Sequence, residues 1–246
     1  MKTLNLESVR EEKGFTLVEL AVVMVIIGLL IGGILKGQEM IANAQVSATV
    51  AQAKGVDAAV STFRDMFDAF PGDMSAAQSA ARLPNCLAAP CSNNGNSDAR
   101  LTDLPGVGNA TGGENLAFWA HLNAADLVSG VDGTATVAWN QGLPAARVGG
   151  GMTAGFTNGA AQLGMNVAPR GGHYITVQGA TGAANGAASG VMTASQAARM
   201  DRKMDDGNAS TGSVFANGDG TCADGAGIYQ EAADTKSCDL YARIAG

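Results

Sequence analysis

The chain starts with a short polar segment and then changes to one long apolar run. Residues 1–14 mix lysine, arginine and glutamate, whereas the 21 residues from Phe15 to Leu35 carry only two polar side chains, Thr16 and Glu19. A helix rises about 1.5 Å per residue, so this run would be roughly 31 Å long and would match the apolar thickness of a bilayer. The pattern predicts a membrane-spanning helix with an acid near its start.

An amphipathic stretch follows the apolar run. Residues 38–69 contain no proline, and four apolar side chains recur at spacings of four, three and four residues, which places them on one helical face. They are Val56, Val60, Phe63 and Phe67. We expect this face to pack on a globular head, and the combined helix to run for about 55 residues until Pro71-Gly72 ends it.

The remainder of the chain predicts short elements between turn residues. Residues 72–112 read as a polar connection, and the Gly-rich stretches 148–164 and 179–190 read as surface loops or insertions. The expected helices are Glu114–Leu127 and Ser195–Met204, and the expected strands are Thr134–Trp139, His173–Gln178 and Gly212–Ala216. A long helix followed by such elements predicts an α+β fold with an antiparallel sheet resting on the C-terminal half of the helix.

The composition excludes some partners and activities. The net charge of −7 at pH 7 argues against nucleic acid as a partner, because phosphate binding needs a basic face. No Ser/His/Asp arrangement has a supporting local motif, and neither Gly-rich stretch has the strand–turn–helix setting of a phosphate-binding loop. We therefore expect no enzyme, and we expect His121 and His173 to be structural.

Three processing routes fit different parts of the N-terminus. An ordinary secretory signal has an apolar core of about 7–15 residues, and Ala42-Asn43-Ala44 imitates its cleavage site, but the run is too long and carries an acid. A plain signal anchor explains the length but not Glu19. Residues 14–20, GFTLVEL, account for both features, because they resemble the processing site of type IV pilins and of the pseudopilins of type II secretion systems.

The resemblance implies a processing scheme and a domain order. In that family a prepilin peptidase cuts before the apolar segment and methylates the new amine, here between Gly14 and Phe15 with methylation of Phe15. The implied parts are a leader at 1–14, a transmembrane and filament-core helix at 15–36, an amphipathic helix at 37–70 and an α+β head at 71–246. Weaker likenesses to a subgroup of large prepilin-type proteins occur at Phe70-Pro71-Gly72-Asp73, Phe118–Leu122 and Asp205–Asn208.

Glu19 needs a partner if it lies in an apolar environment. A carboxylate in a membrane helix costs on the order of 2.5–3.5 kcal/mol on insertion scales. Cleavage would create an amine at Phe15, one helical turn away, and a neighbouring subunit could offer the same amine and so set the axial register of a filament. The alternatives are that Glu19 reaches the headgroups or is protonated.

Four glycines cluster at the far end of the apolar run. Gly28, Gly32, Gly33 and Gly37 each cost about 1 kcal/mol of helix propensity relative to alanine. Their spacing suits close approach between helices. The second interpretation is that this segment unwinds when subunits leave the bilayer. Related pilins often have a proline near here, and this chain has Lys36 in that neighbourhood.

The cysteines and the C-terminal acids suggest further sites. If the head lies outside the cytoplasm, Cys86 can pair with Cys91, and Cys222 with Cys238; of three possible connectivities we expect this local one. The second loop resembles the disulfide-bounded loop of many type IV pilins. Zinc is disfavoured because no Cys-x-x-Cys pair occurs.

The segment NGDGTCADG, with Asp219 and Asp224, could bind calcium, although Asp-Gly pairs are also ordinary turn chemistry.

We therefore expect a structural subunit of a type IV pilus without a cofactor, calcium excepted. Its expected partners are other pilins, the prepilin peptidase and an inner-membrane assembly platform. The precursor would lie in the inner membrane and the product in an extracellular filament. The alternative is a pseudopilin that acts in protein export from a periplasmic pseudopilus.

Overall fold

A computed structural model describes most of the chain. The described residues are 14–83, 85–86, 88–93, 95–102, 104–105, 113–159, 169–181, 190–217 and 220–244. They form two compact units, Met1–Ile41 and Ala42–Gly246, which are considered separately below.

The long helix α1 contributes residues to both units. It runs from Leu17 to Phe67, 51 residues, and ends four residues before Pro71, which confirms the predicted long helix. Its buried side chains all lie in the C-terminal part and include three of the four residues of the predicted apolar face. They are Val46, Thr49, Val50, Ala53, Val56, Ala59, Val60 and Phe63. The fourth, Phe67, is partly buried against the same core.

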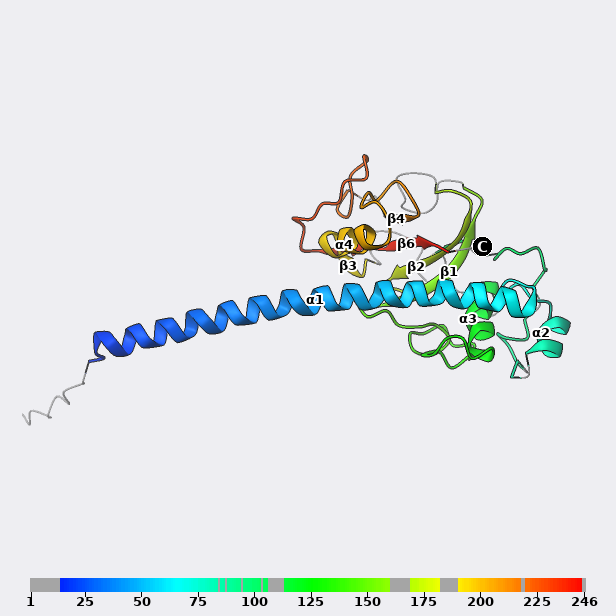
Figure 1. Ribbon diagram of the computed structural model, residues 1–246, viewed down its shortest axis with the longest axis horizontal. Coiled ribbons are helices and arrows are strands. Elements are labelled where there is room, and N and C mark those ends of the chain that lie inside the picture. Colours follow the sequence, from blue (N-terminus) through cyan, green and yellow to red (C-terminus); the bar gives the residue numbers. More distant parts are fainter. Residues whose placement is uncertain are drawn as a thin grey trace, which may run out of the picture. The chain divides into compact units, whose positions relative to one another are not determined.

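The head is an antiparallel sheet with three short helices, as Figure 1 shows. The helices are α2 (Ala76–Arg82), α3 (Glu114–Ala124) and α4 (Ala194–Met204). The strands are β1 (Gly151–Thr157), β2 (Gly172–Gln178), β3 (Met192–Thr193), β4 (Val214–Ala216), β5 (Lys236–Cys238) and β6 (Leu240–Arg243). The main sheet has the order β1-β2-β6-β4, and β3 pairs with β5. These elements confirm the α+β class.

Alternation along the strands gives the main sheet two different faces. Met152, Ile175 and Leu240 belong to one large core cluster that also contains the buried side chains of α1. The intervening positions Tyr174 and Tyr241 belong to a separate small cluster with Phe215. Successive side chains in a strand point to opposite faces, so one face of the sheet completes the core that α1 begins.

Two sequence-based predictions about strands were wrong. Thr134–Trp139 is not a strand: the chain folds back on itself here, and the amide of Gly142 donates to the carbonyl of Thr136. A Cβ on Gly142 would lie 2.5 Å from that carbonyl oxygen, so only glycine permits the contact. Conversely, residues 151–157 of the expected loop 148–164 form β1, which pairs with β2 along its whole length, and the lack of a side chain at Gly155 lets the backbone of Leu104 lie directly against the strand.

Other elements were predicted in part or not at all. The structure confirms strands at His173–Gln178 and within Gly212–Ala216, and the helix Ser195–Met204. The helix expected at Glu114–Leu127 ends at Ala124. The sequence did not lead us to expect α2, which lies inside the expected connection 72–112 and has a capping box formed by Ser75 and Gln78. The short strands β3, β5 and β6 were also not predicted. Most of 179–190 lies outside the described residues.

A buried histidine ties the end of α1 to the head. The amide of Gly72 donates to Nδ1 of His121 (2.8 Å), and Nε2 lies 2.8 Å from the carbonyl oxygen of Cys91. Since Nδ1 accepts a hydrogen bond, the proton must be on Nε2, which fixes the neutral tautomer. Burial lowers the pKa of His121 to about 4. The imidazole thus joins three segments only while it is uncharged.

Replacing His121 with leucine is expected to destabilise the head by roughly 2–4 kcal/mol, because a buried donor and a buried acceptor both lose their partner. The wild-type chain should also lose stability as pH falls from about 6.5 towards 4. In this range His121 binds a proton in the unfolded chain but stays neutral in the folded chain. Urea unfolding at several pH values measures both effects.

His173→Phe is the matched control. His173 is also buried, but its Nε2 has no hydrogen-bond partner among the residues that the structure describes, so this variant should lose clearly less stability than His121→Leu. Equal losses at the two positions would contradict the role given to the His121 hydrogen bonds.

Candidate functional site: an exposed apolar helix with a capped glutamate

The predicted cleavage site is accessible. Gly14 and Phe15 precede α1 in irregular backbone, and Phe15 is 89% exposed. A peptidase needs an extended, reachable backbone at the bond that it cuts, and a peptide bond inside the hydrogen-bonded helix would not offer one. The junction lies outside the hydrogen-bonded helix and is exposed, and cleavage there remains a prediction.

Thr16 and Glu19 form a capping box at the start of α1. Oε2 of Glu19 accepts hydrogen bonds from the amide (2.9 Å) and the hydroxyl (2.8 Å) of Thr16, and the hydroxyl in turn accepts from the amide of Glu19 (3.3 Å). This reciprocal arrangement satisfies backbone donors that a helix start leaves free. Sequence reasoning missed it, although the Thr-x-x-Glu pattern that signals it was present.

The first 19 residues of α1, Leu17–Leu35, form an apolar surface that is exposed in the isolated chain. Every described residue from Gly14 to Leu35 is exposed in the isolated chain, and the first buried residue of α1 is Val46. The helix is long and apolar enough to cross a membrane. So much exposed apolar surface is not stable in water, so this helix must lie in a bilayer or against other protein.

No contact within the described part of the chain requires glycine at four positions of this segment. A Cβ at Gly28, Gly32, Gly33 or Gly37 would meet nothing within 4 Å. Glycine lowers helix stability, so a cluster without an internal steric reason indicates a requirement outside the subunit. The segment is helical throughout, and Lys36 forms an ion pair with Glu39 (2.8 Å) just beyond the apolar run.

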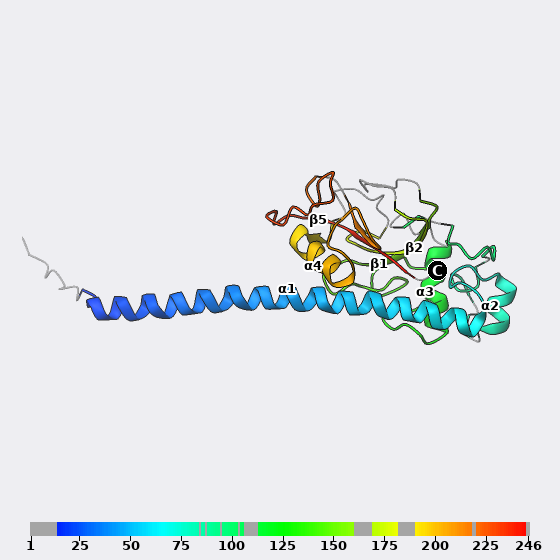
Figure 2. The same cartoon turned by 45° about the horizontal axis from the view of Figure 1, so that its top comes forward.

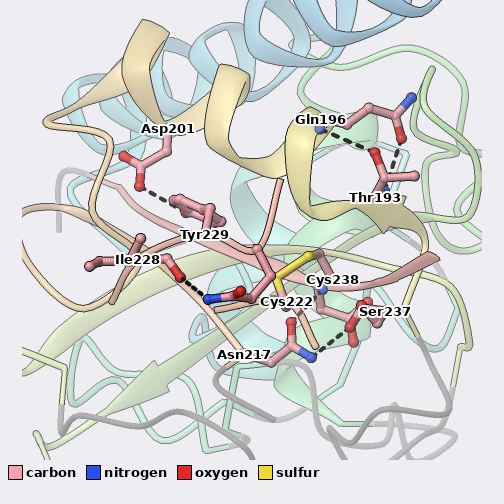
Figure 3. The surroundings of a disulfide bond; sticks show 11 residues. Thr193, Gln196, Asp201, Asn217, Cys222, Ile228, Tyr229, Ser237 and Cys238 are labelled. Carbon is pink, nitrogen blue, oxygen red and sulfur yellow. Dashed lines mark hydrogen bonds between the residues drawn. A yellow bond between two sulfur atoms is a disulfide. The ribbon is translucent and has the colours of Figure 1, made fainter. Parts of the chain in front are cut away.

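The C-terminal part of the head is organised around a disulfide, shown in Figure 3. Cys222 pairs with Cys238, and Cys86 with Cys91, so the connectivity is local. Beside the first of these bonds, the side-chain amide of Asn217 donates to the carbonyl of Ser237 (2.7 Å). The loop between the two cysteines is thereby held against the sheet.

Tyr229 fastens the same loop to α4. Its hydroxyl donates to Oδ2 of Asp201 (2.8 Å), and Oδ1 accepts from the amide of Gly207 (3.2 Å). Burial, with a smaller contribution from the carboxylates of Asp206 and Asp205, raises the pKa of Asp201 to about 6, although the hydrogen bonds from Tyr229 and Gly207 act to lower it. The loop is thus anchored by a carboxylate that titrates near neutral pH.

The predicted calcium loop remains a prediction. Asp219 lies outside the described residues. Oδ1 of Asp224 accepts hydrogen bonds from the amides of Ala226 and Ile228 (both 2.9 Å), which is turn chemistry. Three other carboxylates, on Asp201, Asp205 and Asp206, lie within 4.8 Å of one another, but each accepts hydrogen bonds from the protein.

The residues considered for catalysis or thiolate chemistry are buried. His121 and His173 are at most 4% exposed, and both histidines have a pKa lowered to about 4 by burial. His121 lies beside Cys86 and Cys91, but those two sulfurs are joined to each other. This geometry suits a structural role for both histidines.

Asp201→Asn is expected to change how stability depends on pH. The pKa of the folded carboxyl lies above its unfolded value, so the favourable contribution is complete below about pH 4 and is lost as pH rises through 6. Between pH 4.5 and 7.5 the wild-type chain should lose on the order of 1 kcal/mol relative to the variant, by thermal or urea unfolding.

Asp65→Asn is the control, because it also removes one carboxylate, but from an exposed face of α1. It should follow the wild-type pH profile. If Asp201→Asn follows that profile too, the proposed titration of Asp201 is wrong.

Comparison with known proteins finds one match. Residues 9–35 match the family described as the prokaryotic N-terminal methylation motif, and this range includes the Gly14–Phe15 junction, Glu19 and the whole apolar run. No curated protein and no solved structure matches the chain. The motif points to a family of structural subunits rather than enzymes. Together with the long apolar helix and the antiparallel head, the match to residues 9–35 supports the resemblance to type IV pilins and pseudopilins.

Proposed function

We propose that this chain is a structural subunit of a type IV pilus, cut between Gly14 and Phe15, methylated at Phe15 and polymerised through the N-terminal part of α1. The observation that carries the proposal is the exposed apolar surface of residues 15–35, which ends in a capped glutamate and contains four glycines without an internal role. The membrane would cover this surface in the precursor, and other subunits would cover it in the filament.

Glu19 would set the register between subunits. In the single chain Oε2 is held by Thr16, whereas Oε1 makes no hydrogen bond among the described residues. A carboxylate fixed in this way presents its second oxygen in a defined direction. The methylated amine of Phe15 in a neighbouring subunit is a cation of matching size, and pairing the two would remove both charges from an apolar filament core.

The glycines would then permit close packing of these helices. Association in an apolar environment depends on close van der Waals contact, and Gly28/Gly32 and Gly33/Gly37 both have the small-xxx-small spacing. Unwinding of the same segment on leaving the bilayer remains the second possibility.

A pseudopilin is the second candidate function. The same helix would serve a short filament in the periplasm that acts in protein export. The C-terminal loop closed by Cys222 and Cys238 favours the pilus, because a disulfide-bounded loop in this position resembles that of pilins. Shearing cells and identifying this chain by mass spectrometry in micrometre-long filaments supports the pilus; processed chain that stays with the cells supports the pseudopilus.

Glu19→Ala is expected to leave cleavage intact and to reduce sheared filaments to a few per cent of wild type or less, because the Phe15 amine would be buried without a partner. N-terminal sequencing measures cleavage, and quantitative immunoblotting of the sheared fraction measures assembly. Glu19→Gln keeps the shape without the charge and should assemble almost as poorly. Normal filaments from either variant would exclude the register role.

Thr16→Val is expected to weaken assembly by a smaller factor, roughly 3–30-fold, while cleavage continues. The substitution removes the hydroxyl of the capping box and keeps the side-chain volume, and an N-cap contributes about 0.5–2 kcal/mol. Thr16→Ser, which keeps the hydroxyl, should restore most of the filament yield. If valine and serine give the same yield, the cap does not position Glu19.

A further inference from the structure

Helix α4 carries three basic side chains, Arg199, Arg202 and Lys203, next to the part of α1 that follows the apolar run, and these three are called the basic edge below. Its buried residues are mostly small or apolar, among them Ala194, Ala197, Ala198 and Met200. Arg202 and Lys203 are exposed, and Arg199 is half-buried. Figure 2 shows α4 alongside α1.

The two basic side chains that reach α1 meet neutral partners there. Nη1 of Arg199 donates to Oδ1 of Asn43 (2.6 Å), and Nζ of Lys203 donates to the hydroxyl of Ser47. Asn43 and Ser47 are four residues apart and so lie on one face of the helix. Neither acceptor is charged, so these hydrogen bonds position the two cations without neutralising them.

The acids of this region are largely engaged elsewhere. Glu231 forms an ion pair with Arg202, and Arg199 also contributes to holding the pKa of Glu231 below its usual range. Asp201 is buried against Tyr229, and Asp206 accepts hydrogen bonds from Thr211 and Asn208 beyond the end of α4. In the described part of the chain, neither Arg199 nor Lys203 belongs to an ion pair.

The number of residues between them limits how far the basic edge can lie from the end of the apolar run. Asn43 follows Leu35 by eight residues, so even a fully extended connection would hold it within about 29 Å of that residue. The chain as a whole carries a net charge of −7, and an anionic membrane surface repels it. The positive side chains of the basic edge can be attracted to the same anionic surface.

We propose that Arg199 and Lys203 dock the head on anionic phospholipid headgroups while the N-terminal helix is in the bilayer. The inference rests on the membrane-anchored precursor of the proposed function. Phosphate oxygens take the place of Asn43 and Ser47 as acceptors, or join them, and bring a negative charge into direct contact with both cations. Extraction of the subunit from the membrane then has to break this contact.

The test uses the full chain in nanodiscs of phosphatidylcholine with and without phosphatidylglycerol. The readout is the rate of reductive methylation of Lys203, by mass spectrometry, with the exposed Lys54 of α1 as internal reference. Phosphatidylglycerol should slow methylation of Lys203 about 5–30-fold relative to Lys54, and high salt should abolish the difference.

Arg199→Gln should remove most of the protection of Lys203 in the anionic discs. Arg82→Gln is the matched control, because Arg82 is exposed and donates to the carbonyl of Phe67, at the other end of the buried part of α1. It should leave the protection unchanged. Both variants must show the wild-type melting temperature within a few degrees before the rates are compared.

Three results would overturn the proposal. Equal methylation in both kinds of disc would exclude the lipid contact. Protection that appears without lipid and grows with protein concentration would assign the edge to a second copy of the chain. A chain that does not remain in the discs at all would contradict the membrane anchor itself, and with it the proposed function.

Discussion

The structure depends on one helix that is placed in two different environments. The part of α1 from Val46 onwards has its apolar side chains buried in the head, whereas residues 17–35 of the same helix are exposed in the isolated chain. Burying apolar surface is the main favourable term in folding, so the first part is stabilised by the fold and the second is not. The second part exposes apolar side chains that the head does not bury, and in the proposed function lipid and then other subunits would cover them.

The ends of α1 are fixed by specific polar contacts. At the start, Thr16 and Glu19 cap each other. At the far end, the turn after the helix is held by His121, which bonds Gly72 and Cys91 as a neutral imidazole. The head therefore packs on the part of α1 from Val46 to Phe63, and hydrogen bonds of His121 hold the turn that follows the helix. The N-terminal cap lies in the part of α1 that the head leaves free, where assembly would take place.

Sequence patterns predicted this helix better than they predicted the head. The apolar run, the spacing of Val56, Val60 and Phe63 and the Pro71-Gly72 stop are local signals, and the helix has the expected course. Strand β1 and the turn at Gly142 were misread because glycine there serves close approach between distant backbones, which local propensity does not record. The three carboxylates near Asp201 come together only in the folded chain, and the Thr16 cap had a visible sequence signal that was not used.

The position of β6 has a consequence for how the head is made. This strand, Leu240–Arg243, lies between β2 and β4 in the middle of the main sheet, although it is the last element of the chain. Strands β2 and β4 are therefore joined only when β6 pairs with both, so closing the main sheet depends on contacts between distant parts of the sequence. The disulfide of Cys222 likewise needs Cys238, two residues before β6. One short segment, residues 236–243, thus completes both sheets and carries the second cysteine of this disulfide.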